Sequence, residues 1–217
     1  MSSPEDRCRL VLIVPEHAGE DGGKALLEAA LKGGDVASVI LPQYALPDHD
    51  FQKRAEVLVP PIQNAGAAAI LRGDSRVAGR VKADGLHVDT GPADLADAME
   101  RLSPKLIVGA GGATERHTAL ELGEARPDYV FFGKLDGDIK PEAHPKNLAL
   151  AEWWASMIEI PCIVMGGTAL DSALAGAESG AEFVALREAV FSAPQGAAAA
   201  VAEINALLDE KAPRFAD

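Results

Sequence analysis

The chain has few cysteines, a deficit of basic residues and no long apolar run, and each scarcity narrows the choice of protein class. Only two of its 217 residues are cysteine, and both stand inside apolar runs, Cys8 in Cys-Arg-Leu-Val-Leu-Ile-Val and Cys162 in Pro-Cys-Ile-Val-Met. Two isolated cysteines in such surroundings favour buried, reduced thiols over a disulfide framework. We therefore expect a cytoplasmic protein.

Basic residues are outnumbered, with 20 Lys and Arg against 33 Asp and Glu, which gives a formal net charge of -13. A surface this acidic repels nucleic acid and anionic lipid at long range, so any site for an anion has to be local. No run approaches the roughly 18 apolar residues of a membrane span, and the first residues, Met-Ser-Ser-Pro-Glu-Asp-Arg, lack the apolar core of a signal peptide. We expect neither a nucleic-acid partner nor a membrane.

Several catalytic motifs are missing as well. The sequence has no Cys-x-x-Cys, no His-Glu-x-x-His, no Gly-x-Ser-x-Gly, and no Gly-x-Gly-x-x-Gly after a predicted strand. These absences argue against a structural zinc site, a hydrolase nucleophile elbow and a dinucleotide site. Phosphate binding is the chemistry that remains.

Short apolar runs alternate eight times with longer segments rich in Ala, Leu and Glu. The predicted strands are Leu10–Val14, Val36–Leu41, Ala67–Leu71, Gly85–Val88, Leu106–Gly109, Tyr129–Phe132, Cys162–Met165 and Phe183–Leu186. The predicted helices are Lys24–Leu31, Phe51–Asn64, Ser75–Val81, Ala93–Leu102, Glu115–Leu122, Leu148–Ile158, Leu170–Ser179 and Gly196–Glu210. Pro92 marks the start of the fourth helix, Thr114 is a candidate N-cap for the fifth, and Gly123 and Gly180 follow the ends of the fifth and seventh.

Runs such as Leu-Val-Leu-Ile-Val are apolar at every position, which is typical of strands buried on both faces of a parallel sheet. Eight strand-helix units can close into a (β/α)8 TIM barrel, for which 217 residues is a compact length. No linker interrupts the pattern, so we predict a single α/β domain, a (β/α)8 barrel over residues 1-217. An open doubly wound sheet is the alternative.

In such a barrel the loops that follow the strands build the site. Gly166-Gly167-Thr168, after the seventh strand, suits phosphate because glycine lets backbone N–H groups approach an anion, and a tight turn is an equal alternative. His87 and Asp89 point the same way from the fourth strand, with a barrel histidine satisfied by a neighbour as the alternative. Arg187 and Glu188 stand where two rim charges can pair with each other.

The loop after the sixth strand contains Asp136-Gly137-Asp138. This spacing suits a Mg²⁺ ion held by one or two carboxylates. It is also typical of a solvated turn, and both interpretations stay open at this point.

Five blocks of the sequence carry a family resemblance, and they are Ala83-Asp84-Gly85-Leu86-His87-Val88, Ile107-Val108-Gly109, Pro127-Asp128-Tyr129-Val130-Phe131-Phe132-Gly133, Pro161-Cys162-Ile163-Val164-Met165-Gly166-Gly167 and Gly180-Ala181-Glu182-Phe183-Val184-Ala185. In this order and spacing they resemble the thiamine phosphate synthase family from about the second strand to the eighth. The first and third blocks are specific in combination, whereas the last two occur in many phosphate-binding barrels.

The resemblance implies a (β/α)8 barrel of thiamine biosynthesis, a transferase that joins hydroxymethylpyrimidine pyrophosphate to a thiazole phosphate and releases pyrophosphate with the help of Mg²⁺. Cations and an Asp-held Mg²⁺ are then expected, because the leaving pyrophosphate gains negative charge. Asp89 is the candidate metal ligand, and Asp94 is the alternative. Phosphate would be held by Gly166, Gly167, Thr168, Arg187 and Lys140, the last of which matches the lysine of the family's Thr-rich loop after the sixth strand.

The chain departs from the family's pattern at several strand ends. The Gln-x-Arg-x-Lys pattern that ends the family's second strand is replaced by Ile40-Leu41-Pro42-Gln43-Tyr44, and the Asn-Asp pair that ends the third by Arg72-Gly73. The serine of the fifth-strand turn falls on Gly111. The serine near the eighth strand falls on Glu188, whose carboxylate would repel a phosphate unless Arg187 offsets it.

A sister branch of the family, the thiazole tautomerases, has a histidine where this chain has Lys134. A lysine in the barrel mouth acts as an acid or base, or holds an anion, and an exposed loop lysine is the alternative. Three hypotheses follow: a thiamine phosphate synthase with a rearranged site; other chemistry on a phosphorylated small molecule, with Lys134, His87 and Asp89 as reacting groups; or a non-catalytic paralogue that binds a thiamine intermediate or a protein. Self-association into a homo-oligomer is left open.

Overall fold

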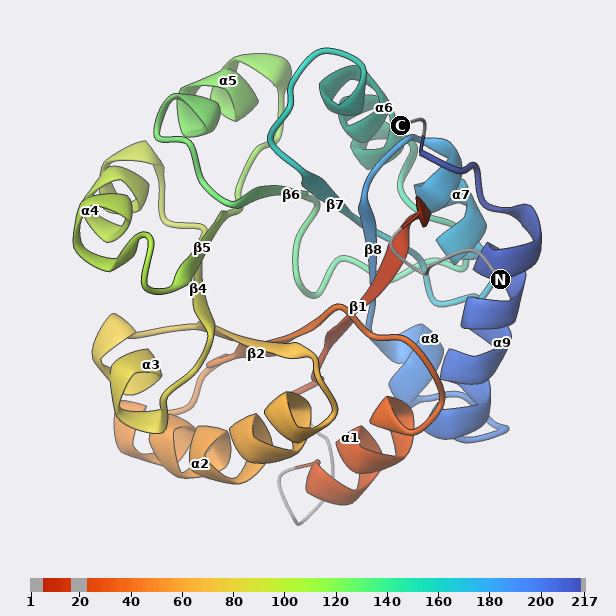
Figure 1. Ribbon diagram of the computed structural model, residues 1–217, viewed down its shortest axis with the longest axis horizontal. Coiled ribbons are helices and arrows are strands. Elements are labelled where there is room, and N and C mark those ends of the chain that lie inside the picture. Colours follow the sequence, from red (N-terminus) through yellow and green to blue (C-terminus); the bar gives the residue numbers. More distant parts are fainter. Residues whose placement is uncertain (1–5, 17–22, 216–217) are drawn as a thin grey trace.

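Eight parallel strands close into a barrel in the computed structural model, which describes residues 6–16 and 23–215. Neighbouring strands follow the chain order from β1 to β8, and β8 pairs with β1 to complete the circle (Figure 1). The helices form a ring outside the strands. The predicted (β/α)8 barrel is therefore confirmed, and the doubly wound alternative is wrong because an open sheet would leave two edges unpaired.

The strands are β1 (Arg9–Ile13), β2 (Ser38–Pro42), β3 (Ala68–Arg72), β4 (Gly85–Val88), β5 (Ile107–Ala110), β6 (Tyr129–Phe132), β7 (Cys162–Met165) and β8 (Phe183–Leu186). The helices are α1 (Lys24–Leu31), α2 (Asp48–Asn64), α3 (Ser75–Val81), α4 (Pro92–Leu102), α5 (Arg116–Glu124), α6 (Pro145–Ala155), α7 (Ser172–Glu178), α8 (Glu188–Phe191) and α9 (Ala197–Lys211). Every predicted strand and helix is present, and no predicted end is wrong by more than three residues.

Two of the four helix-end signals are confirmed. Pro92 is the first residue of α4, where a missing N–H costs nothing. Gly180 follows α7 with φ 82°, a left-handed conformation that glycine adopts without strain.

The other two helix-end signals were wrong, and one helix was missed. Glu115 rather than Thr114 is the N-cap of α5. Gly123 lies inside α5, where a Cβ atom would come within 2.9 Å of the Trp154 ring, so close helix packing accounts for this glycine. The four residues of α8 are too few to show a helical period in the sequence.

The inward-facing strand residues form a core of their own, separate from the layer between strands and helices. Its members are apolar and mostly branched or aromatic: Val11, Ile13, Ile40, Ile70, Tyr129, Phe131, Ile163, Met165 and Ala185. β4 and β5 contribute His87 and Gly109 at the corresponding level of the barrel. The interior is therefore polar on the β4 side and apolar elsewhere.

Carboxylates stand directly before three of the even-numbered strands, and each accepts a hydrogen bond from the strand that precedes it in the barrel. These bonds run from the backbone N–H of Ala69 to Asp84 at 2.8 Å, of Val108 to Asp128 at 2.7 Å, and of Cys162 to Glu182 at 2.8 Å. The acidic residues of the Ala-Asp-Gly, Pro-Asp-Tyr and Ala-Glu-Phe triplets thus bind neighbouring strands together at the amino-terminal end of the barrel.

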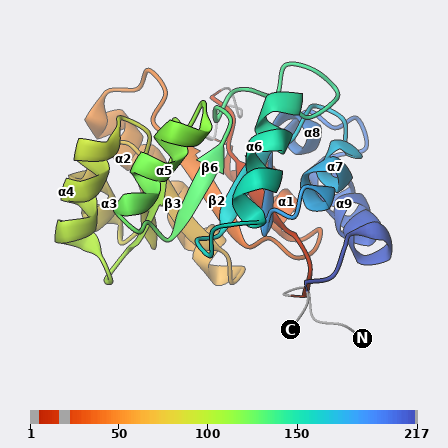
Figure 2. The ribbon, with the colours of Figure 1, turned by 90° about the horizontal axis from the view of Figure 1, so that it is seen from above.

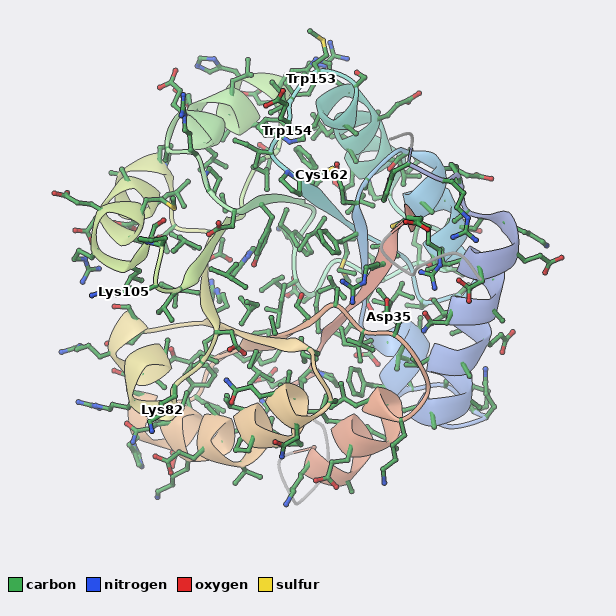
Figure 3. All side chains as sticks on the ribbon, viewed as in Figure 1. Asp35, Lys82, Lys105, Trp153, Trp154 and Cys162 are labelled. Atoms are coloured by element: carbon green, nitrogen blue, oxygen red, sulfur yellow. The ribbon has the colours of Figure 1, made fainter. Side chains whose placement is uncertain are left out.

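The two tryptophans hold α6 against the barrel wall. Trp154 is fully buried, meets Phe132 of β6 edge to face, and donates its indole N–H to the carbonyl oxygen of Ile160 at 2.7 Å. Trp153 lies farther out (Figure 3), under the guanidinium group of Arg116 at 5.0 Å. Trp154 thus anchors the helix that follows the charged loop after β6.

Both cysteines are free and buried, as predicted. Burial raises the pKa of the Cys8 thiol to about 12, and burial raises the pKa of Cys162 as well. Both thiols are therefore protonated at neutral pH, which leaves neither of them as a nucleophile.

Candidate active site

All eight strands end on the same side of the barrel, and the segment between β6 and α6 rises above these ends (Figure 2). Sites of (β/α)8 barrels are built on this side. The residues predicted for the site come from the ends of β4, β6, β7 and β8, and the closed barrel brings these ends into one ring.

His87 is a buried polar side chain of the barrel interior, only 3% exposed. Its Nδ1 atom lies 3.0 Å from the hydroxyl oxygen of Tyr129, and its ring stacks on Tyr129 and meets Phe131 edge to face. Burial lowers the pKa of His87 to about 4, and the opposing effect of the Asp89 carboxylate is weaker. The imidazole is therefore neutral at neutral pH.

Gly109 in β5 and Gly111 just after β5 leave room for the side chains of Tyr129 and His87. A Cβ atom on Gly109 would overlap the ring of Tyr129, and one on Gly111 would come within 2.5 Å of Nε2 of His87. The absence of a side chain at Gly111 therefore leaves the space that the imidazole occupies. Steric fit accounts for both glycines.

A cavity of about 330 Å³ opens above His87 at the strand ends. It is lined by Pro42, Tyr44, Arg72, His87, Asp89, Gly112, Gly133, Lys134, Leu135 and Asp136. The three residues predicted to react, His87, Asp89 and Lys134, therefore share one cavity. Its volume is at the lower end of the range for small-molecule sites.

Arg72 and Asp89 form an ion pair across the ends of β3 and β4. Nε of Arg72 lies 3.1 and 3.2 Å from the two carboxylate oxygens of Asp89. Both residues, with His87, also line a second cavity of about 320 Å³ that extends between α3 and α4 and includes Asp94 and Arg101. The ion pair thus stands between two hollows that a two-part ligand or two ligands can fill.

Lys134 is exposed at the edge of the first cavity. Its carbonyl oxygen accepts the N–H of Gly137 at 3.0 Å in a tight turn, and its ammonium group makes no ion pair with any residue of 6–16 or 23–215. Gly133 before it has φ 126°, and a Cβ there would come within 2.6 Å of the Met165 side chain. This geometry supports an anion-holding lysine more than a buried acid or base.

The backbone N–H groups of the predicted phosphate loop already have acceptors within the chain. Gly166 donates to the carbonyl oxygen of Ala185 at 2.9 Å, Gly167 to the Ser172 hydroxyl at 2.9 Å, and Thr168 to the carbonyl oxygen of Lys140 at 2.8 Å. The tight-turn interpretation thus has direct structural support. Phosphate binding by these three residues stays a prediction, as does binding by the exposed side chain of Lys140.

Arg187 is paired chiefly with Asp138 rather than with its neighbour. Its Nε and Nη2 atoms lie 2.8 and 2.7 Å from one carboxylate oxygen of Asp138, whereas Glu188 is 3.8 Å away. The side chain of Asp138 is 0% exposed. The solvated turn predicted for Asp136-Gly137-Asp138 is present at the exposed Asp136 and Gly137. It is wrong for Asp138, because the loop folds inward there and buries the carboxylate against the guanidinium of Arg187.

Sequence reasoning assigned no site role to Arg72 or Tyr129, although both meet the predicted residues. Arg72 ends β3, which pairs with β4, and Tyr129 is the first residue of β6 and stands inside the third block of the family resemblance. For Arg72 the position at a strand end was the available signal, whereas for Tyr129 the block of the family resemblance in which it stands was a further signal. Asp74, also at the end of β3, instead caps α3 by accepting the N–H of Arg76 at 2.7 Å.

A family model described as thiamine monophosphate synthase matches residues 10–190. The chain belongs to this family. It is 36% identical over 205 residues to a thiamine-phosphate synthase of Rhodospirillum centenum, covering 93% of this chain and 98% of that protein. It is 32% identical over 217 residues to the thiamine-phosphate synthase of Hyphomonas neptunium, covering 97% and 98%.

A solved structure of thiamine phosphate pyrophosphorylase from Pyrococcus furiosus has the same fold, with a TM-score of 0.78 at 20% identity over 96% of this chain and 98% of that one. Tryptophan synthase from M. tuberculosis superposes with a TM-score of 0.69 at 16% identity, covering 94% of each chain. Both likenesses concern the barrel alone.

Thiamine phosphate synthases join hydroxymethylpyrimidine pyrophosphate to thiazole phosphate, so the family acts on phosphorylated small molecules. Among the described residues of this chain, no helix is both long enough and apolar enough to span a membrane. The described residues also contain no cluster of three or more His, Cys, Asp or Glu side chains placed to hold a metal ion.

Proposed function

We propose that the chain transfers a hydroxymethylpyrimidine group from its pyrophosphate ester to a thiazole in the barrel mouth. One observation carries this proposal: His87, Asp89 and Lys134 line a single cavity together with Arg72. A pyrophosphate leaving group gains negative charge as it departs, and preorganised cations stabilise that charge. Arg72 and Lys134 are the cations whose positions suit this role.

His87 supplies hydrogen bonding in this proposal rather than charge. Its Nδ1 atom is engaged by Tyr129, which leaves Nε2 for a ligand in the cavity. The neutral imidazole follows from its burial. The neutral imidazole of His87 can therefore orient a polar ring of the substrate without repelling the positively charged coupled product.

The metal ion expected from the family fits this part of the mouth. A Mg²⁺ ion that binds with a diphosphate needs only one or two protein carboxylates, and Asp89 and Asp94 line the same cavity. When bound there, Mg²⁺ supplies additional neutralisation of the leaving group. Asp89 would then exchange part of its ion pair with Arg72 for the metal, which frees the guanidinium for a phosphoryl oxygen.

A direct test incubates the purified protein with hydroxymethylpyrimidine pyrophosphate, a thiazole acceptor in its free or phosphorylated form, and Mg²⁺, and measures the coupled product by chromatography. We expect coupled product above a no-enzyme control. Lys134→Ala should lower kcat/KM at least tenfold, about 1.4 kcal/mol of transition-state stabilisation. Lys146→Ala, which removes an exposed lysine outside both cavities, is the matched control and should retain full activity. No product with either acceptor would overturn the proposal.

A further inference from the structure

Tyr44 has a backbone conformation that a large aromatic residue seldom adopts. It is the second residue of a turn after β2, closed by a hydrogen bond from the N–H of Leu46 to the carbonyl oxygen of Gln43 at 3.1 Å. Its φ is 50°, in the left-handed region where glycine and asparagine are favoured. The two other described non-glycine residues with positive φ, Lys82 and Arg126, come just after helices α3 and α5, where a left-handed residue commonly ends a helix. Strained residues elsewhere concentrate at functional sites.

The turn that carries Tyr44 is held by three further hydrogen bonds of Gln43. The backbone N–H of Gln43 donates to the carbonyl oxygen of Arg72 at 2.9 Å, which extends the pairing of β2 with β3. Its side-chain amide donates to the carbonyl oxygen of Leu46 at 2.9 Å and to the carboxylate of Asp48 at 2.8 Å. The surrounding chain therefore fixes the backbone from which the Tyr44 side chain extends.

The side chain of Tyr44 is also anchored at its far end. Its hydroxyl donates to the carbonyl oxygen of Val14 at 2.9 Å, so the ring extends from the end of β2 to the end of β1. Burial raises the pKa of this hydroxyl, and the opposing effect of the Arg187 guanidinium is weaker. Tyr44 therefore presents an uncharged ring that a hydrogen bond holds in place.

Tyr44 lines the first cavity together with Arg72, His87 and Lys134. Among the described residues of this lining, it carries the one benzene-type ring, and the imidazole of His87 is the other aromatic group. The side chain is only partly buried, so a ligand in the cavity can reach it. The face of such a ring attracts a positive charge placed within about 6 Å of its centre. The cavity thus combines cations for phosphate groups with an aromatic ring suited to a cation.

A positive charge arises in the proposed reaction itself. The bond from the pyrimidine methylene carbon to the pyrophosphate oxygen breaks, and pyrophosphate leaves with the bonding electrons. The thiazole ring nitrogen donates its lone pair to the same carbon and becomes positively charged. We infer that the ring of Tyr44 binds this charged thiazolium ring through a cation–π contact and stabilises the charge as it forms. This inference rests on the proposed function and adds a binding residue for the charged half of its product.

Isothermal titration calorimetry of the full chain tests the inference with two ligands: the phosphorylated coupled product, and its isostere in which carbon replaces the positively charged ring nitrogen. Tyr44→Leu should weaken binding of the charged product at least about fivefold more than binding of the uncharged isostere. Tyr44→Phe keeps the ring, so its effects on the two ligands should differ by less than about twofold. Phe215→Leu, which removes an exposed ring outside both cavities, should leave both affinities unchanged.

Tyr44→Asn serves if the leucine variant does not fold, because asparagine tolerates positive φ and has no ring; it should show the same selective loss. Equal losses for the two ligands in these variants would show that Tyr44 only shapes the turn, and would overturn the inference alone. A selective loss of the same size in Tyr44→Phe would also overturn it, because the hydroxyl rather than the ring would then be responsible. Absence of coupled product in the transfer assay of the unaltered protein would overturn the proposed function, and the inference with it.

Discussion

The hydroxyl group of Tyr129 lies 3.0 Å from Nδ1 of His87, and this is the one hydrogen bond that either side chain makes with a described residue. Burial raises the pKa of Tyr129, so its hydroxyl keeps its proton and has to donate it. The arrangement that satisfies both groups has the hydroxyl donating to Nδ1 and the histidine proton on Nε2. Nε2 then offers an N–H donor to a ligand in the cavity.

The first prediction concerns this hydrogen bond. Tyr129→Phe leaves the buried Nδ1 atom without a donor, which should lower the free energy of unfolding by about 1–3 kcal/mol. Urea denaturation measures the loss. Tyr44→Phe removes the partly exposed hydroxyl that donates to the carbonyl oxygen of Val14, and about 1 kcal/mol or less is expected there. Equal losses in the two variants would contradict the structural role of the His87–Tyr129 pair.

The second prediction concerns pH. Because the pKa of His87 is lowered from 6.5 to about 4, the unfolded chain binds a proton between these values that the folded chain does not bind. The free energy of unfolding should therefore fall as pH falls from about 6.5 toward 4, by at most roughly 3 kcal/mol from this residue. His87→Gln should flatten the pH profile in this window. His117→Gln, at a side chain 78% exposed, should leave the slope as it is, and identical slopes in all three proteins would refute the assignment.

The third prediction compares two glycines. Gly109→Ala places a methyl group into the ring of Tyr129 and should destabilise the protein by about 1–3 kcal/mol or more through overpacking. Gly79→Ala adds the same methyl group to α3, with no atom within 4 Å, and should stabilise by up to about 1 kcal/mol because alanine favours helix. Thermal unfolding separates the two. A stable Gly109→Ala variant would show that the interior has more room than the structure indicates.

The fourth prediction concerns the thiols. Cys8 and Cys162 are 1% and 0% exposed, and burial raises the pKa of each, so an aromatic disulfide reagent at pH 8 should label neither in the native protein. Both should react once urea unfolds the chain. Cys162→Ser should leave a single reactive thiol in urea. Rapid labelling of the native protein would contradict the burial of the β7 strand.

Local sequence patterns predicted some residues of the site correctly and missed the contacts of others. His87 and Asp89 were predicted on one side of a strand end because side chains alternate along a strand, and both line the same cavity. The N–H groups of the glycine loop were predicted as phosphate donors. Gly166 and Gly167 instead donate to Ala185 and Ser172, and Thr168 donates to Lys140, which lies in the loop after β6. The contact with Lys140 joins two distant loops, and no local pattern reveals it.

The sequence by itself determined the barrel and the ring of residues at its mouth. Eight apolar runs separated by helical segments require parallel strands, and chain direction alone places the end of every strand on one side. Only the tertiary structure decided which residues meet there. Asp138 and Arg187 are 49 residues apart, and His87 and Tyr129 are 42 apart. Such pairs depend on strand register and on the path of one loop, which follow from closing the barrel and packing its interior rather than from any local preference of the chain.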